Sequence, residues 1–257
     1  MRTEKSTYLT AGQLADYERD GFLVVRRMVS ALEIAGLSRA IDAIAARAPV
    51  FGKEMFYYED CLKEKGRRIL SRIEKFADYD EALRDFVTAD RMIGPASELL
   101  GEPAVLFKEK VNFKLPGGGG FLPHQDIQPG WDDYAPFFIS ALVPIDDSTI
   151  ENGCLRLAAG HHKKGLIGRK WKPLQGDELK GIEFRNYPMA PGDVAFFDCF
   201  VPHESKPNLT DEPRRNLYLT YNRLGDGDHR EKYFADKRKS FPPDNEREPG
   251  KQYVFRV

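Results

Sequence analysis

The sequence contains little cysteine, with three residues in a chain of 257 and no CxxC pair. An odd number of widely separated cysteines indicates neither a disulfide framework nor a zinc site built from thiolates. We therefore expect Cys61, Cys154 and Cys199 to be reduced thiols.

Long apolar runs are absent as well. No stretch approaches the roughly 20 apolar residues needed to cross a bilayer. The first residues, MRTEKSTYLTAGQL, lack the apolar segment of a signal peptide, so we expect a cytoplasmic protein. The formal net charge of −1 indicates no general attraction to nucleic acid or to an anionic membrane, and the expected partner is a small-molecule substrate.

The N-terminal part, residues 1–103, is expected to be mostly helical. Thr10 with Gln13, and Ser30 with Glu33, match the capping box in which two side chains satisfy the free N–H groups at a helix start. The segment GFLVVRRMV between them indicates a short strand. Further along, the aromatic residues of EMFYY are expected to reach the site from this helical part.

From residue 104 to 225 the pattern changes to short runs rich in Val, Ile, Phe and Tyr, separated by Gly, Pro and Asp. This pattern is typical of a β-sandwich or barrel. Residues 226–257 are polar and contain proline, which indicates a surface extension. No low-complexity linker is visible, so we predict a single domain, 1–257, of the α+β class, mainly β, with N-terminal helices packed on the sheet.

A histidine and an aspartate lie one residue apart in GFLPHQDIQPGW. If this segment is extended, His124 and Asp126 point to the same face, and His203 follows a later apolar run. Two imidazoles and one carboxylate form the facial triad that leaves positions open on Fe(II). The same ligands suit zinc or a non-catalytic metal-binding barrel, so the pattern alone leaves three alternatives. The other histidines lie in a turn or in the polar tail and are not expected to bind metal: His161, His162 and His229.

An arginine segment, RRNLYLTYN, follows His203. In an extended chain, Arg214 and Asn216 share a face with Tyr218 and Thr220. A guanidinium binds a carboxylate through two parallel hydrogen bonds, and the amide of Asn216 is suited to add a third. Arg214 is therefore a candidate anchor for a dicarboxylate near the distal histidine.

Four ordered segments together resemble the phytanoyl-CoA dioxygenase-like group of Fe(II)/2-oxoglutarate oxygenases. They are LTAGQLADYERDGFLVVRRMVSALEIAGLSRAID, PHQD, IENGCLRLAAGHHKKG and MAPGDVAFFDCFVPHESKPNLTDEPRRNLYLTYN. The resemblance covers most of the chain. One departure is visible, because the usual Pro-Gly-Ser-His loop reads AGHH here.

The resemblance implies a double-stranded β-helix of the jelly-roll or cupin type. It implies Fe(II) held by His124, Asp126 and His203, and 2-oxoglutarate anchored by Arg214 with help from Ser205. It also implies reaction with O₂ that releases succinate and CO₂ and hydroxylates the substrate. Iron halogenases of the wider superfamily replace the carboxylate ligand with a small residue, and the aspartate retained here favours hydroxylation.

Candidate binding residues lie around these motifs. Strand alternation in LFKEKVNFKLP places Lys108, Lys110, Asn112 and Lys114 on one face, which is either a solvated edge or one wall of the site. We expect Asn112, Lys108 and Asn216 to contact 2-oxoglutarate. The expected substrate contacts are Gln125, Gln128, Trp131 and Lys110. The basic face predicts a small soluble metabolite that is anionic or amino-acid-like.

The zinc alternative is a hydrolase, which needs a general base near the metal-bound water. Glu204 is adjacent to His203, but strand alternation turns the two side chains to opposite faces. Such a hydrolase works without O₂, and a non-catalytic barrel consumes no 2-oxoglutarate. These two properties separate the alternatives from the oxygenase.

Overall fold

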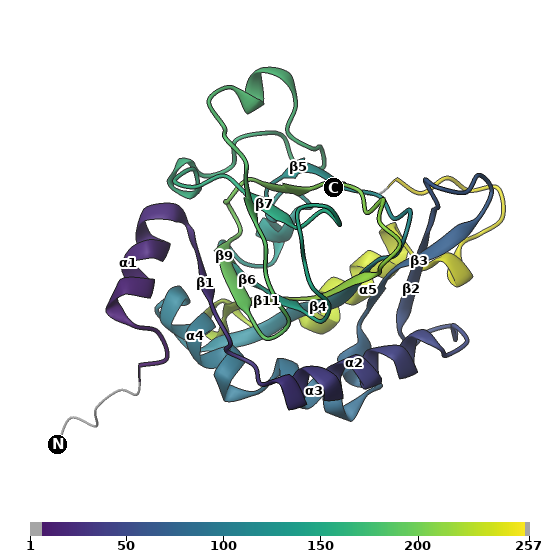
Figure 1. Cartoon of the computed structure of the whole chain (residues 1–257), viewed down its shortest axis with the longest axis horizontal. Helices are drawn as coiled ribbons and strands as arrows, with labels where there is room; N and C mark the ends of the chain where they lie inside the picture. The colour runs from purple at the N-terminus through teal and green to yellow at the C-terminus, as the bar shows by residue number, and fades with distance from the viewer. Residues whose placement is uncertain (1–6, 255–257) are drawn as a thin grey trace.

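Two antiparallel sheets form the centre of the molecule, shown as a computed structural model that describes residues 7–254 (Figure 1). The larger sheet has the strand order β1 (Phe22–Val25), β9 (Val194–Asp198), β6 (Phe138–Pro144), β11 (Arg214–Arg223), β4 (Ala104–Lys114), β3 (Arg68–Glu74) and β2 (Met55–Asp60). The smaller sheet has the order β5 (Phe121–His124), β10 (His203–Ser205), β7 (Leu155–Leu157) and β8 (Arg185–Tyr187). The two sheets form the expected double-stranded β-helix.

Helices cover the outer face of the larger sheet. They are α2 (Ala31–Ala45), α3 (Glu81–Val87) and α4 (Asp90–Leu100), which lie on the side away from β5 and β7 in Figure 1. The apolar stripe of α2 is buried against the sheet in one hydrophobic cluster that also contains Val111 and Leu217. Burial of one such side chain contributes about 1.5–3 kcal/mol, which explains why this face of the sheet is fully covered.

The two predicted helix starts are confirmed. Thr10 caps α1 (Ala11–Asp20) and Ser30 caps α2, and both form the complete capping box with Gln13 and Glu33. The short strand between them is β1, which pairs with β9 at one edge of the larger sheet. The three cysteines form no disulfide. Within residues 7–254, no helix is long and apolar enough to span a bilayer.

The expectation of a mostly helical N-terminal part was wrong for residues 55–74. This stretch forms β2 and β3, which extend the larger sheet beyond β4. The EMFYY aromatics therefore reach the site from a strand and not from a helix. Met55, Phe56 and Tyr57 are all buried in succession, because β2 is covered on both faces. A strand buried on both faces shows no alternation of polar and apolar residues, so its sequence lacks the usual strand signal.

The C-terminal extension also differs from the expected surface tail. It contains α5 (Arg230–Ser240), which packs on β4 and buries Tyr233 and Phe234. Ion pairs tie both ends of α5 to the sheet: Arg230 to Glu109 at 2.6 Å and Lys237 to Glu74 at 2.5 Å. The outermost residues of the predicted domain, 1–6 and 255–257, lie outside the described residues.

Candidate active site

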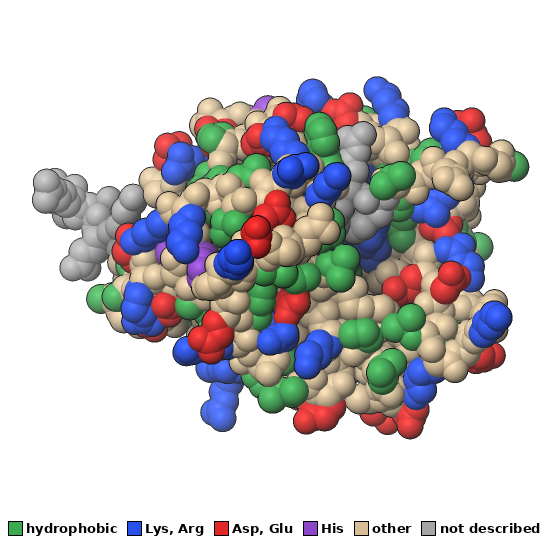
Figure 2. All heavy atoms as spheres, turned by 90° about the horizontal axis from the view of Figure 1, so that it is seen from above, with side chains coloured by type: hydrophobic (Ala, Val, Ile, Leu, Met, Phe, Trp, Pro, Cys, Tyr) green, Lys and Arg blue, Asp and Glu red, His purple; other side chains and the backbone are tan. Residues whose placement is uncertain are grey.

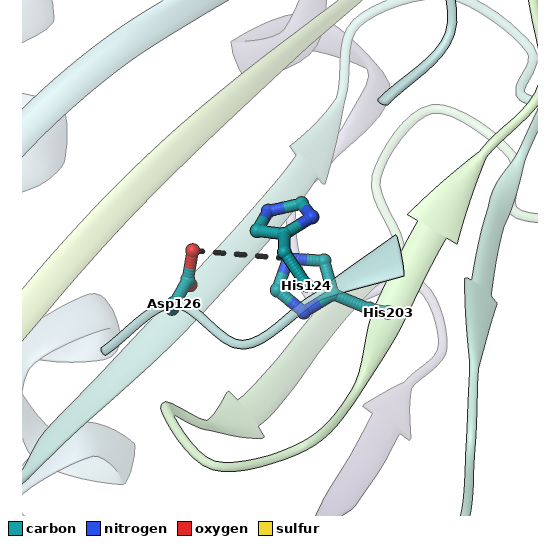
Figure 3. Close-up of side chains that lie close together, drawn as sticks. All are labelled: His124, Asp126 and His203. Carbon is teal, nitrogen blue, oxygen red and sulfur yellow. Dashed lines mark ion pairs between the residues drawn. The ribbon is translucent and has the colours of Figure 1, made fainter. Parts of the chain in front are cut away.

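Three side chains converge where β5 meets β10 (Figure 3). His124 ends β5 and pairs with His203 at the start of β10, and their ring centroids are 4.1 Å apart. Asp126 places a carboxylate oxygen 3.7 Å from Nε2 of His203. One ligand atom from each residue lies within 4.8 Å of the other two, so a single ion can contact all three.

The route by which Asp126 reaches this position differs from the sequence prediction. The extended segment ends at His124, and Asp126 lies in the turn that follows. The turn, and not strand alternation, therefore brings the carboxylate beside the imidazoles. A short turn has this effect because it redirects the chain within one or two residues.

Both imidazoles are oriented by backbone carbonyls. Nδ1 of His124 lies 2.7 Å from the carbonyl of Leu122, and Nδ1 of His203 lies 3.0 Å from that of Val201. A carbonyl only accepts, so each Nδ1 carries the proton and each Nε2 presents a lone pair to the common centre. Burial and the charge of His203 lower the pKa of His124 to about 3, so its ring is neutral at physiological pH.

The carboxylate of Asp126 is held in its charged form. Burial by itself raises its pKa, but the charges of His203, His124 and Lys110 outweigh this effect and lower it. The hydroxyl of Ser140, on β6, donates to Oδ2 of Asp126 at 2.5 Å. The second oxygen, Oδ1, faces the imidazoles. Two neutral imidazoles and one carboxylate are the donor set that Fe(II) takes in a facial triad.

A buried arginine without a counter-ion lies at the start of β11. Arg214 is 2% exposed, and no described carboxylate forms an ion pair with it. Its Nη1 donates to Ser148 at 3.3 Å and, with the Asn216 amide turned to satisfy both neighbours, to Asn216 at 2.6 Å. Its Nε has no partner, and burial lowers its pKa. An unpaired buried guanidinium is costly, which indicates an anionic ligand.

Two adjoining cavities open at the triad and share His124 in their walls. The first, of about 400 Å³, is lined by Asn112, Lys114 and Phe121 among others. The buried amide oxygen of Asn112 has no hydrogen-bond partner. The second, of about 330 Å³, contains both His124 and Asp126 in its wall. The metal centre is therefore accessible from two sides.

The inner wall of the second cavity is strongly cationic. Its basic side chains come from β3, β4 and α5: Arg72, Lys108, Lys110 and Lys237. Besides Asp126, the acid on this inner wall is Glu74. The side chains of Asp133 and Asp236 lie at the outer rim, 66% and 40% exposed, where Lys170 and Lys232 pair with them. The surface seen in Figure 2 carries charges of both signs interspersed, so the excess of positive charge is confined to the cavity.

Glu74 satisfies part of this charge. It lies 2.5 Å from Nζ of Lys237 and 2.7 Å from Nε of Arg72. Burial of Glu74 opposes its ionisation, but these two cations outweigh it and lower its pKa. The carboxylate is therefore charged and occupied by its neighbours.

Lys108 and Lys110 have neither a hydrogen bond nor an ion pair in the described structure, and both contact aromatic rings. Nζ of Lys108 lies 4.7 Å from the ring of Trp131 and 5.3 Å from that of Tyr233. Nζ of Lys110 lies 5.0 Å from the ring of Tyr218. Burial, with a smaller effect of Lys108, lowers the pKa of Lys110 to about 7. Two ammonium groups beside the metal centre are thus available to a ligand.

The sequence pattern of the phytanoyl-CoA dioxygenase (PhyH) family matches residues 17–216. The chain belongs to the phytanoyl-CoA dioxygenase family. It is similar to 2-aminoethylphosphonate dioxygenase from uncultured bacterium HF130_AEPn_1, at 36% identity over 249 residues that cover 96% of this chain and 94% of the relative. Methylphosphonate hydroxylase from Gimesia maris is 37% identical over 237 residues, covering 92% of this chain and 89% of the relative.

The fold is shared with a solved structure as well. EctD from S. alaskensis, crystallised with 2-oxoglutarate and 5-hydroxyectoine, has a TM-score of 0.73 and 23% identity, covering 88% of this chain and 80% of EctD. This likeness confirms the fold class. Membership of the phytanoyl-CoA dioxygenase family confirms the expected enzyme class, a 2-oxoglutarate-dependent non-haem iron dioxygenase with Fe(II) and 2-oxoglutarate as cofactors.

Two expected substrate contacts are placed elsewhere in this member of the phytanoyl-CoA dioxygenase family. Gln125 is fully buried and donates to the carbonyls of Gly165 and Phe200. Gln128 is equally buried and donates to the carbonyls of Arg169 and Lys172. Their amides hold the neighbouring loop in place, and neither side chain lines the two cavities. Trp131 and Lys110, by contrast, line the second cavity.

Three cavity residues escaped sequence reasoning. Arg72 and Glu74 alternate with buried apolar residues in RILSRIE, and two charges inside a strand-like apolar run are the available signal for them. Lys237 has no such signal, because α5 is polar along its whole length and only its packing turns one lysine inward.

The loop that departs from the family pattern lies apart from the triad. His162 packs beside Tyr17 of α1, with ring centroids 6.4 Å apart, and His161 contacts Lys164. Neither histidine lies in either cavity wall. The AGHH sequence therefore affects how α1 docks and leaves the metal centre unchanged.

Proposed function

We propose that this oxygenase hydroxylates a small organophosphonate. Iron is held by His124, Asp126 and His203, and 2-oxoglutarate is anchored through its distal carboxylate by Arg214 and Ser205. The observation that carries the proposal is the cationic inner wall of the second cavity, where Lys108 and Lys110 lack an anionic partner. Two relatives above 35% identity are named for activity on phosphonates, which supports the same class of substrate.

The residues present fit the implied cofactors. Both histidines present an Nε2 lone pair, Asp126 is charged, and the unpaired guanidinium of Arg214 matches a carboxylate. When bound, Fe(II) and 2-oxoglutarate supply O₂ activation, in which the oxoacid is converted to succinate and CO₂ and an oxygen atom is inserted into a C–H bond.

The chain's own contribution is binding and orientation. Ser140 fixes the carboxylate of Asp126, and the carbonyls of Leu122 and Val201 fix the two imidazoles. The lysines of the second cavity hold the substrate's anionic group beside the metal. The aromatic rings of Trp131 and Tyr233 cover these lysines and exclude water, which strengthens the attraction between unlike charges.

A phosphonate suits this wall better than a carboxylate does. It offers three acceptor oxygens and up to two negative charges near neutral pH, as a phosphate group does. Two flexible ammonium groups contact three oxygens as point charges, whereas planar carboxylates favour the forked geometry of arginine. A dianion also offsets the positive charge that Glu74 leaves uncompensated.

The zinc-hydrolase alternative finds no base in the structure. Glu204 is ion-paired with Arg156 on the neighbouring strand β7 and is therefore occupied away from the triad. The non-catalytic alternative offers no reason for the cations that line the second cavity.

The test is a substrate comparison with Fe(II), 2-oxoglutarate and air. We expect 2-aminoethylphosphonate or methylphosphonate to raise succinate formation at least tenfold above the substrate-free rate, with a hydroxylated product detected by mass spectrometry. β-Alanine, the carboxylate counterpart of 2-aminoethylphosphonate, serves as the matched comparison, and His124→Ala as the inactive control. Stimulation by β-alanine but by neither phosphonate would refute the substrate class while leaving the oxygenase chemistry intact.

A further inference from the structure

A second buried cation lies directly beside the proposed anchor of 2-oxoglutarate. Lys114 of β4 is the register partner of Arg214 on β11, and the two residues are 3% and 2% exposed. No described carboxylate forms an ion pair with either of them. Two adjacent buried cations without an anion are unfavourable in a folded protein, and a bound carboxylate relieves both.

The ammonium group of Lys114 also sets the direction of a neighbouring hydroxyl. Its Nζ donates to Oγ of Ser205 at 2.7 Å and to the carbonyl of Lys206 at 2.5 Å, and it lies 3.5 Å from the carbonyl of Gly153. An ammonium group has no acceptor, so the serine oxygen must accept this bond. The hydroxyl proton of Ser205 is then free to be donated to a ligand.

The cations of the site are separated between the two cavities. Lys114 lines the first cavity together with Asn112, whereas Lys108 lines the second. Burial and the charge of Arg214 lower the pKa of Lys114 to about 6, as expected for a site that lacks its anion. The first cavity thus suits a dicarboxylate, and the second a separate anionic substrate.

We propose that Lys114 is a positioning residue for 2-oxoglutarate: it fixes Ser205 as a hydrogen-bond donor and, with Arg214, makes a two-cation site for the distal carboxylate. This inference rests on the proposed anchoring of 2-oxoglutarate by Arg214 and Ser205. It makes a specific demand on affinity. Loss of Lys114 must weaken oxoacids that have a distal carboxylate and leave those without one unaffected.

The test compares two oxoacids in the Fe(II)-loaded protein without oxygen. 2-Oxoglutarate and 2-oxobutyrate share the metal-chelating oxoacid group, but 2-oxobutyrate lacks the distal carboxylate. Their affinities are measured by calorimetry and by the visible absorption of the Fe(II)–oxoacid chelate. We expect Lys114→Met to weaken 2-oxoglutarate at least tenfold and 2-oxobutyrate less than twofold, with Lys114→Arg retaining most of the affinity. Lys63→Met, a lysine outside both cavities, is the matched control and should change neither value.

The outcomes separate this inference from the proposed function. Equal weakening of both oxoacids, or of neither, in Lys114→Met would overturn the role of Lys114 while wild-type binding of 2-oxoglutarate stands. If wild-type protein fails to bind 2-oxoglutarate, the proposed anchor itself is wrong. Should Lys114→Met not fold, Ser205→Ala must reduce the preference for 2-oxoglutarate over 2-oxobutyrate, and an unchanged preference refutes the inference.

Discussion

Removal of the Ser140 hydroxyl is the most direct test of how the chain prepares its metal centre. In Ser140→Ala, the 2.5 Å hydrogen bond to Oδ2 of Asp126 is lost. Ser140 is 1% exposed and Asp126 is 9% exposed, so bulk water has little access to replace the missing donor. The carboxylate keeps its charge but loses the contact that fixes its orientation toward His203.

The magnitude follows from two independent quantities. A hydrogen bond to a charged group contributes about 1.5–3 kcal/mol. Loss of a hydrogen bond to a metal ligand typically costs about 10–100-fold in metal affinity, which is roughly 1.4–2.8 kcal/mol. The two ranges agree, and we expect Ser140→Ala to raise the Fe(II) dissociation constant by about 10–100-fold.

The measurement is anaerobic equilibrium dialysis of Fe(II) at fixed 2-oxoglutarate, repeated with Co(II). Ser148→Ala is the matched control, because its hydroxyl faces Arg214 and not the metal ligands. The control should keep its metal affinity. An unchanged Fe(II) affinity in Ser140→Ala, with the fold intact by circular dichroism, would refute the idea that this hydroxyl holds the ligand in place.

Three further outcomes are expected. Lys110→Met should raise the KM of the anionic substrate about 10–100-fold, since a charge-assisted contact of about 1.5–3 kcal/mol is lost, while 2-oxoglutarate affinity stays constant. Because the pKa of Lys110 is lowered to about 7, its ammonium loses its proton as the pH rises through that value; substrate KM should rise there, and Lys110→Met should lack that component of the pH profile. Glu109→Gln breaks the buried pair with Arg230 and should cost about 3–5 kcal/mol, lowering the melting temperature by about 6–15 °C in calorimetry; a shift below about 2 °C would contradict a structural role for α5. Gly153→Ala, whose Cβ would lie 2.1 Å from the carbonyl of Lys206, should also lower the melting temperature.

Features with a local chemical cause were predictable from the sequence. The capping boxes at Thr10 and Ser30 satisfy backbone groups within three residues, so four letters suffice to place each helix start. The ordered segments with His124, His203 and Arg214 were recognisable because a facial triad and a dicarboxylate anchor require those residue types in that order. The structure then brings the two histidines together on paired strands.

Features that depend on distant partners were not predictable. Nothing in the polar sequence of α5 indicates that it packs on β4, because its attachment comes from Arg230 with Glu109 and Lys237 with Glu74. The wall role expected for Gln125 failed for a related reason, since its partners are carbonyls that the fold brings from residues 165 and 200.

The sequence by itself determined the chemistry of the metal ligands, because imidazole and carboxylate groups are donors wherever the chain places them. It also determined the class of enzyme, through motifs whose order is tied to that chemistry. Only the tertiary structure decided which lysines share a cavity with the metal and which share one with Arg214. The physical reason is that an ammonium group changes from a solvated surface charge into a binding group only when packing removes water and leaves it without an anion.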